Sequence, residues 1–228
     1  SEEEINLDAV ANVKGEATGQ AYIMVDDLGQ NSIMIHAGAN NAFTPAHVQA
    51  HQAIIEKSDF IIAQFESHLA STIQAFEIAK KAGVKTILNP APAMEKVPEE
   101  LLRLTDIIIP NETETEILTG IKITDEASMQ KAAQKLHDLG IEGVIITVGS
   151  KGAYYDVHGE SGIVPAFKVE AKDTTAAGDT FIGALSTVLK KDLSNLRAAI
   201  SYGNQASSLT VQRFGAQPSI PYLNEMKP

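Results

Sequence analysis

The chain has 228 residues, of which 44% are hydrophobic, and it carries a formal charge of −11 and no cysteine. This length suits one large domain with a substantial buried core. The negative charge argues against a protein that holds nucleic acid through its surface field. The lack of cysteine excludes disulfides and thiolate metal sites and agrees with a cytoplasmic location. The longest apolar runs are far too short to span a bilayer, so we expect no membrane partner.

The first part of the chain predicts a β-hairpin. Residues 21–25 and 32–36 are short runs typical of β-strands, and residues 26–31 between them are mostly polar or glycine. Two such runs with a turn-rich segment between them favour an antiparallel pair. No other part of the sequence suggests antiparallel pairing.

From about residue 44 the pattern changes to alternating helices and strands. Thr44 followed by Pro45 is typical of a helix start. The predicted helices are residues 44–57, 69–82, 112–118, 125–139, 176–190 and 196–211, and the predicted strands are residues 59–65, 84–88, 106–109, 143–147 and 153–157. Strands without polar alternation, separated by helices, indicate a parallel sheet covered on both faces. The predicted fold class is therefore α/β.

Polar side chains follow the ends of these strands, which is where open α/β sheets bind ligands. The residues delivered there are Glu66, Asn89, Asn111, Glu112, Glu114, Thr147, Gly149 and Ser150. Each has an ordinary explanation as a turn or cap residue, and Asn111 could merely cap the helix that follows it. Four strand ends with the same character favour a ligand site.

Residues 172–184 (KDTTAAGDTFIGA) are the most informative segment. A turn of small residues at 176–178 leads into an amphipathic helix whose first turn contains Asp179. Small residues let backbone N–H groups approach a ligand closely, and a helix start favours negative charge. Such a turn could stabilise a transferred phosphoryl group while Asp179 accepts a proton from the attacking hydroxyl. The alternative is an ordinary helix start, capped by Asp173 or Thr174, with Asp179 in solvent.

This segment resembles the C-terminal signature of the ribokinase-like (phosphofructokinase-B type) carbohydrate kinases. Further segments match the family in the same order along the chain, at residues 15–19, 36–40, 66–67, 89–92, 110–114, 147–152 and 215–219. The resemblance implies a single kinase domain over residues 1–228, with a mostly parallel sheet flanked by helices on both faces. Residues 9–37 would contribute to a small β-sheet lid, through which a homodimer would form.

The resemblance also implies ATP-dependent phosphorylation of a sugar hydroxyl, with D-ribose as the expected acceptor. Members of the family begin with a strand that delivers a sugar-binding aspartate, followed by further lid strands and a Gly-Gly motif. The sequence shows none of these, so we expect that the N-terminal part of the family domain is missing. The implied partners are ATP and a small sugar, and the implied cofactors are Mg²⁺ and an activating K⁺.

Roles carried over by matched position are as follows. Asp179 would be the general base and would contact the sugar together with Glu66. The backbone of Ala176, Ala177 and Gly178 would form an anion hole. The ATP site would comprise Asn111, Thr147, Gly149, Ser150, Lys151, Gly152, Gly178 and Asn204. Glu114 would organise Mg²⁺ through water. Thr210 and Arg213 would contribute only a backbone carbonyl to the site of the monovalent cation. The residues of that site would be Asp173, Thr175, Thr210, Arg213, Gly215 and Ser219.

The sequence also allows other interpretations. A kinase of the same family could act on fructose, a nucleoside or a phosphosugar, or the chain could be a non-catalytic nucleotide-binding module. His47 and His51 have the i, i+4 spacing of a zinc pair, but no third ligand or glutamate base adjoins them. A dinucleotide-binding dehydrogenase is disfavoured because no Gly-x-Gly-x-x-Gly follows a strand.

Overall fold

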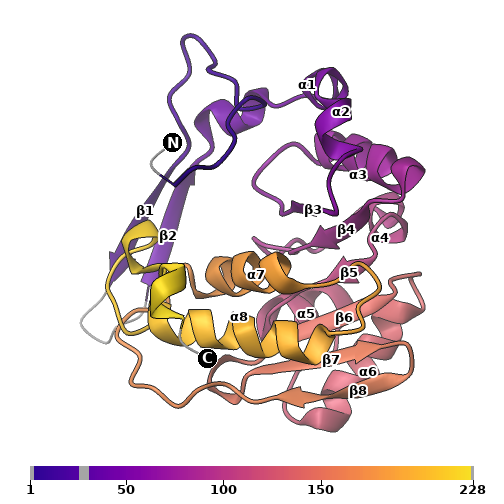
Figure 1. Cartoon of the computed structure of the whole chain (residues 1–228), viewed down its shortest axis with the longest axis vertical. Helices are drawn as coiled ribbons and strands as arrows, with labels where there is room; N and C mark the ends of the chain where they lie inside the picture. Colours follow the sequence, from indigo (N-terminus) through magenta and orange to yellow (C-terminus); the bar gives the residue numbers. More distant parts are fainter. Residues whose placement is uncertain (1–2, 26–30, 227–228) are drawn as a thin grey trace.

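The computed structural model describes residues 3–25 and 31–226, and its largest element is a mixed β-sheet (Figure 1). The strand order is β3 (Phe60–Ala63), β4 (Lys85–Leu88), β5 (Ile107–Ile108), β6 (Gly143–Thr147), β7 (Ala153–Val157) and β8 (Glu160–Val164). Strands β3 to β6 pair in parallel, whereas β7 and β8 are antiparallel to their neighbours. The α/β class is therefore confirmed, and the expectation that only the N-terminal hairpin is antiparallel is wrong.

Helices cover both faces of this sheet, as the sequence predicts. Ile145 of β6 belongs to a buried cluster with residues of α7 (Ala177–Val188) and α8 (Leu196–Thr210). Its neighbours Val144 and Ile146 belong to a second cluster with residues of α3 (Leu69–Ala82), α4 (Glu99–Arg103) and α6 (Glu126–His137). This alternation explains why the strands read as continuous apolar runs. No helix in the described ranges is both long and apolar enough to cross a membrane.

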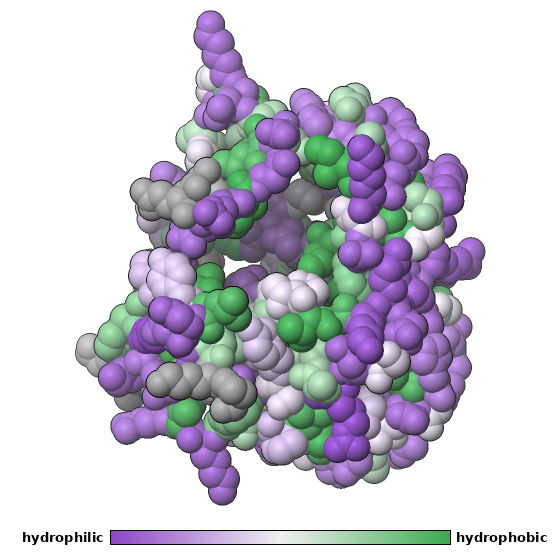
Figure 2. Space-filling model, viewed as in Figure 1, coloured by the Kyte–Doolittle hydropathy of each residue, from purple (hydrophilic) through white to green (hydrophobic). Residues whose placement is uncertain are grey.

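The N-terminal hairpin stands apart from the main sheet (Figure 1). Strands β1 (Gln20–Val25) and β2 (Asn31–His36) pair antiparallel as expected, although the turn at residues 26–30 lies outside the described residues. At the hairpin base, Gly38 has a φ of +51°, and a Cβ there would lie 2.2 Å from the carbonyl oxygen of Ala17. Only glycine therefore suits this crossing. Figure 2 shows that the molecule is hollowed between the hairpin and α7.

Three local features differ from the sequence prediction. The helix expected over residues 44–57 is divided into α1 (Pro45–Ala50) and α2 (Gln52–Ile55), because the His51 ring contacts the carbonyl oxygen of His47 at 2.9 Å and competes with the helical ladder. Helix α4 and strand β8 were not predicted. Strand β8 follows a tight turn in which His158 and Gly159 both have positive φ, a pattern typical of two-residue hairpins.

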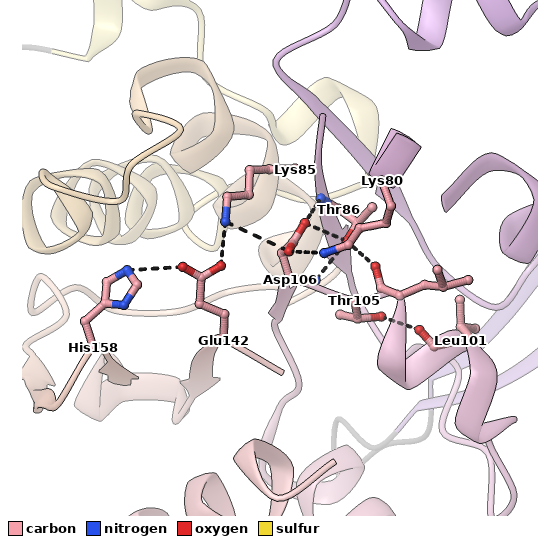
Figure 3. A network of polar contacts seen from close by, with 9 residues as sticks. Lys80, Lys85, Thr86, Leu101, Thr105, Asp106, Glu142 and His158 are labelled. Atoms are coloured by element: carbon pink, nitrogen blue, oxygen red, sulfur yellow. Dashed lines mark hydrogen bonds and ion pairs between the residues drawn. The ribbon is translucent and has the colours of Figure 1, made fainter. Parts of the chain in front are cut away.

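A polar network ties the strands together at the amino end of the parallel part of the sheet (Figure 3). The carboxylate of Asp106, which is 7% exposed, receives Lys80 Nζ at 2.6 Å and the backbone N–H of Thr86 at 2.9 Å. Lys85 bonds Glu142, which also contacts the ring of His158 at 3.2 Å. These contacts fix the relative positions of β4, β5 and the start of β6 at the edge opposite the predicted site.

Helix α5 (Glu112–Thr119) packs against α6 and β6. The chain after α8 continues through short 3₁₀ turns, η3 (Gln217–Ser219) and η4 (Leu223–Glu225), which return beside the start of α7. The N-terminal helices α1 and α2 pack on α3 through Val48, Ala75 and Ile78. The polar residues at the carboxyl ends of the strands are thereby left open toward the hairpin.

Candidate active site

The predicted strand ends converge on one cavity of about 200 Å³. We call it the carboxylate cavity, because Glu66, Glu114 and Asp179 line it. Asn89, Asn111 and Thr147 line it as well, each from the end of a different strand, and Gly178 and Asp179 enter from the start of α7. The structure thus brings these strand ends together, whereas Glu112, Gly149 and Ser150 of the predicted set line a second cavity. That they form one ligand site stays a prediction.

Asn111 caps a helix and also lines the cavity. Its side chain caps α5 by accepting from the backbone N–H of Glu114 at 2.8 Å. In return, the carboxylate of Glu114 accepts from the backbone N–H of Asn111 at 2.8 Å and from its side-chain amide at 2.9 Å. Burial raises the pKa of Glu114, and the hydrogen bond from Asn111 opposes this shift. The pair forms a rigid polar wall of the cavity.

The start of α7 provides free backbone donors. Ala176, the residue before the helix, has a φ of +60°, which is unfavourable for a residue with a Cβ by about 1–2 kcal/mol. The first α-helical bond runs from the N–H of Thr180 to the carbonyl of Ala176 at 2.9 Å. The N–H groups of Gly178 and Asp179 precede it and have no acceptor within the helix. They are therefore available to a negatively charged ligand.

A larger cavity of about 650 Å³ lies on the other side of this helix start. We call it the α7–α8 cavity, since residues of both helices line it. It shares Asn111, Thr147 and Gly178 with the carboxylate cavity, so the two cavities meet at the first turn of α7. Of the residues predicted for a nucleotide, it is lined by Asn111, Thr147, Gly149, Ser150, Gly152, Gly178 and Asn204, whereas Lys151 is exposed and not part of its lining.

Two of these residues shape the cavity through the backbone. The amide of Asn204, which is 6% exposed, donates to the carbonyl oxygens of Val164 at 3.0 Å and Pro165 at 3.2 Å. Gly152 has a φ of +107°, and a Cβ there would lie 2.1 Å from the carbonyl oxygen of Val164. Both residues hold the end of β8 in place, and that segment leads directly into the cavity wall.

The segments predicted to hold a monovalent cation lie side by side. The carboxylate of Asp173 accepts from the backbone N–H of Thr175 and from that of Gly215, each at 2.9 Å. Hydrogen bonds from Thr175 and Gly215 hold the pKa of Asp173 below its usual value. Thr210 is fully buried and donates to the hydroxyl of Thr180 at 3.1 Å. The loop is thereby fastened to the start of α7.

The remaining members of that set are directed elsewhere. The side chain of Arg213 pairs with Glu225, an interaction that raises the pKa of Arg213 and lowers that of Glu225. Ser219 is fully buried and its hydroxyl donates to the carbonyl of Ala216 at 2.6 Å. Backbone carbonyls of this outer loop, and the hydroxyl oxygen of Ser219, which keeps its lone pairs, therefore remain for a cation. Within the described residues, no three His, Asp or Glu side chains lie close enough to hold a metal alone.

A third cavity of about 470 Å³ lies between the hairpin base and the start of α3. Gly19, His36 and Asn40 line it from the hairpin side, and Glu66 and His68 line it from the main sheet. Glu66 is thus shared with the carboxylate cavity. The two histidines with the spacing of a zinc pair make local contacts, since His47 contacts the hydroxyl of Thr44 at 2.9 Å and His51 contacts the His47 carbonyl.

Sequence reasoning missed several residues of these cavities. Gln64 lines the carboxylate cavity, and Phe167 and Lys168 line the α7–α8 cavity. A signal for Gln64 was present, because it is a polar residue near the end of an otherwise apolar run and lies two positions before Glu66. In an extended chain, residues two apart point to the same side. No comparable signal marks Phe167 or Lys168, which follow an edge strand that was not predicted.

Comparison with known proteins points to one family. The family model described as pfkB family carbohydrate kinase matches residues 1–223. The ribokinase of Staphylococcus aureus is 52% identical over 209 residues, which cover 92% of this chain and 68% of that protein. The bifunctional ribokinase/ribose-5-phosphate isomerase A of Fructilactobacillus sanfranciscensis is 52% identical over 217 residues, which cover 95% of this chain and 40% of that protein.

The fold agrees with this similarity. The structure of Arabidopsis thaliana ribokinase complexed with ribose and ATP matches with a TM-score of 0.85 at 34% identity, over 93% of this chain and 69% of that one. The chain therefore spans between 40% and 69% of the lengths of these three proteins. The family model, in contrast, covers nearly all of the chain. The chain belongs to the pfkB family of carbohydrate kinases.

Proposed function

We propose that the protein transfers the γ-phosphoryl group of ATP to a hydroxyl of a sugar, and that D-ribose is converted to ribose 5-phosphate. The observation that carries the proposal is the meeting of two cavities at the first turn of α7. Phosphoryl transfer needs an acceptor and a donor on opposite sides of a group of anion-stabilising N–H donors. The relatives named as ribokinases support ribose as the acceptor.

Asp179 is the proposed general base, and the sugar is proposed to bind between Asp179 and Glu66. Both carboxylates line the carboxylate cavity and are solvent-exposed. As the sugar hydroxyl attacks phosphorus, its proton passes to the carboxylate of Asp179. The N–H groups of Gly178 and Asp179, next to the strained Ala176, stabilise the charge on the transferred group. The turn formed by Ala176, Ala177 and Gly178, which positions these N–H groups, is the backbone of the proposed anion hole.

ATP is proposed to occupy the α7–α8 cavity, with its phosphates at Gly178. The cavity volume of about 650 Å³ lies within the 300–1,000 Å³ typical of ligand pockets. Mg²⁺ usually binds one or two carboxylates together with substrate phosphates and water. Glu114 fits this role, because each of its oxygens receives only one hydrogen bond from Asn111 and it lines the same cavity as Gly178. Mg²⁺ would neutralise negative charge on the phosphates there.

We also propose an activating K⁺ at the loop fastened by Asp173. The loop at 173–175 and the loop at 213–219 meet through the Asp173–Gly215 hydrogen bond, and Thr210 links the same region to α7. Backbone and hydroxyl oxygens are suitable ligands for such a hard cation. A cation bound there would order the start of α7 and, through it, the anion hole.

The hairpin is proposed to act as a lid over the sugar and as the contact of a homodimer in the cytoplasm. Its described side chains include exposed large apolar groups on both faces, among them Tyr22, Ile23, Met24, Met34 and Ile35. An isolated two-stranded hairpin is marginally stable in water and gains from a partner surface. An exposed patch of this kind is typical of a protein–protein contact.

The assignment of Asp179 is tested by Asp179→Asn in the protein that contains these residues. The amide has nearly the same shape but cannot accept the proton, so kcat should fall by roughly 10²–10⁴. ATP affinity, measured by calorimetry, should change little. Asp138→Asn, at an exposed position after α6, is a matched control and should keep full activity. A variant at 179 that retains most of its kcat would exclude this carboxylate as the base.

A further inference from the structure

The side chain of Gln64 lines the carboxylate cavity and is not used in the phosphoryl transfer proposed above. It directly follows β3 and lines the cavity together with Glu66, Asn89 and Asp179. Its side chain is partly buried, which separates it from the freely solvated glutamines of the helix surfaces. A neutral amide among three carboxylates brings hydrogen-bond donors without adding charge.

The orientation of the Gln64 amide is fixed by the backbone. Its Oε1 accepts the N–H of Glu66, and an N–H can only be paired with the oxygen end of the amide. The nitrogen end must therefore point the other way. Among the described residues, every buried side-chain nitrogen or oxygen has a hydrogen-bond partner, whereas Gln64 Nε2 has no protein acceptor there. Gln64 Nε2 is therefore accessible to solvent. The nitrogen consequently reaches the space of the cavity.

The other two amides of this cavity differ from Gln64. The nitrogen of Asn89 donates to the carbonyl oxygen of Ile109 at 2.9 Å. The nitrogen of Asn111 donates to Glu114 Oε1 at 2.9 Å. Both amides are thus engaged in holding the walls together. Among the side-chain amides that line the carboxylate cavity, Gln64 is the one whose nitrogen has no acceptor within the described part of the chain.

From this arrangement we infer that Gln64 Nε2 donates a hydrogen bond to a hydroxyl oxygen of the bound sugar. The inference rests on the function proposed above. A sugar hydroxyl is both a donor and an acceptor, whereas an ionised carboxylate can only accept. Glu66 and Asp179 can satisfy hydroxyl protons, but they cannot satisfy hydroxyl lone pairs. Gln64 supplies the missing donor and sets the orientation of the sugar relative to Asp179.

Two substitutions separate this role from that of holding Glu66. Gln64→Met removes both ends of the amide, whereas Gln64→Glu keeps an oxygen for the N–H of Glu66 and, when ionised at pH 8, removes the donor. The loss of a neutral hydrogen bond corresponds to roughly a tenfold change. We expect the KM for ribose to rise about tenfold in both variants, with the KM for ATP within about twofold of wild type in Gln64→Met. Gln130→Met, at an exposed position on α6, is the control and should match wild type.

Monodeoxy analogues of ribose identify the hydroxyl concerned. The analogue that lacks the partner oxygen should have the same KM with wild type and with Gln64→Met, since neither enzyme can form the bond. A wild-type KM for ribose in Gln64→Glu would show that Gln64 acts only by holding Glu66, and would overturn the inference. The same conclusion follows if no analogue removes the difference. A wild-type enzyme that is silent with ribose would instead refute the proposed function and, with it, the sugar contact.

Discussion

The packing of α8 against α7 makes a specific prediction for Gly203→Ala. Gly203 is buried in α8, and a Cβ built there would lie 2.8 Å from Cδ2 of Phe181 and 2.9 Å from its carbonyl oxygen. The ring could turn slightly, but the carbonyl belongs to the backbone of α7. An alanine at this position must therefore push the two helices apart.

Two opposing effects determine the size of the change. Replacing glycine by alanine inside a helix favours folding by about 1 kcal/mol. Overpacking a tight interface typically costs about 1–3 kcal/mol, and contact with a backbone atom places this case in the upper part of that range. The expected result is a net loss of about 1–2 kcal/mol. For a protein of this size, that corresponds to a fall in Tm of about 2–8 °C.

Urea denaturation followed by circular dichroism measures this difference directly. Gly183→Ala is the matched control, because Gly183 is exposed within α7 and a Cβ there meets nothing within 4 Å. The control should gain up to about 1 kcal/mol from helix propensity alone. If Gly203→Ala is as stable as Gly183→Ala, the spacing of α7 and α8 is not limited by this contact and the reasoning is refuted.

Three further predictions follow from other parts of the structure. Because the pKa of Asp173 is lowered in the folded state, the carboxylate of Asp173 should contribute to stability above pH 4, and this contribution should be lost as the pH falls through the folded pKa. The urea midpoint of wild type should therefore fall more between pH 6 and pH 3 than that of Asp173→Asn. Parallel pH dependences of the two midpoints would contradict this. Turnover at saturating Mg²⁺ should rise with K⁺ and fall when Na⁺ replaces it, and rates indifferent to the cation would exclude the proposed site. Asp106→Ala leaves the fully buried N–H of Thr86 without its acceptor, so the free energy of unfolding should fall by about 1–3 kcal/mol. The KM for ATP should be unchanged. A large change in this KM would show that the two ends of the sheet are coupled.

The elements that the sequence predicted best have strong local signals. Helix α3 ends where expected, because Gly83 follows it in the left-handed conformation. Strands β6 and β7 are short apolar runs with glycine at or beside their ends, and both have the predicted bounds. In contrast, β8 carries Glu160, Ser161 and Gly162, which favour no strand by themselves. It forms because the edge of β7 offers backbone partners, and that depends on tertiary structure.

The candidate site was predictable to the extent that strand ends determine it. Asn89, Asn111 and Thr147 could be placed together because parallel strands end at the same edge of a sheet. The sequence could not show that Asn204 turns its amide to Val164 and Pro165, forty residues earlier in the chain. It also could not show that the amide of Gln64 is held by Glu66. Both facts depend on which neighbour each amide finds after folding.

The polar network at the amino end of the sheet has a consequence for how the specificity of the proposed site can change. Asp106, Lys80 and Thr86 supply buried interactions at one edge, while the strained and exposed groups of the proposed site lie at the other. Substitutions in the proposed acceptor pocket therefore leave the stabilising contacts at the amino edge of the sheet unchanged. Most substitutions lower the stability of a protein. Because the stabilising contacts of the amino edge lie away from the proposed site, substitutions that change its specificity leave those contacts intact and the protein folded. Laboratory evolution toward other sugars should accordingly begin from variants strengthened at the amino edge.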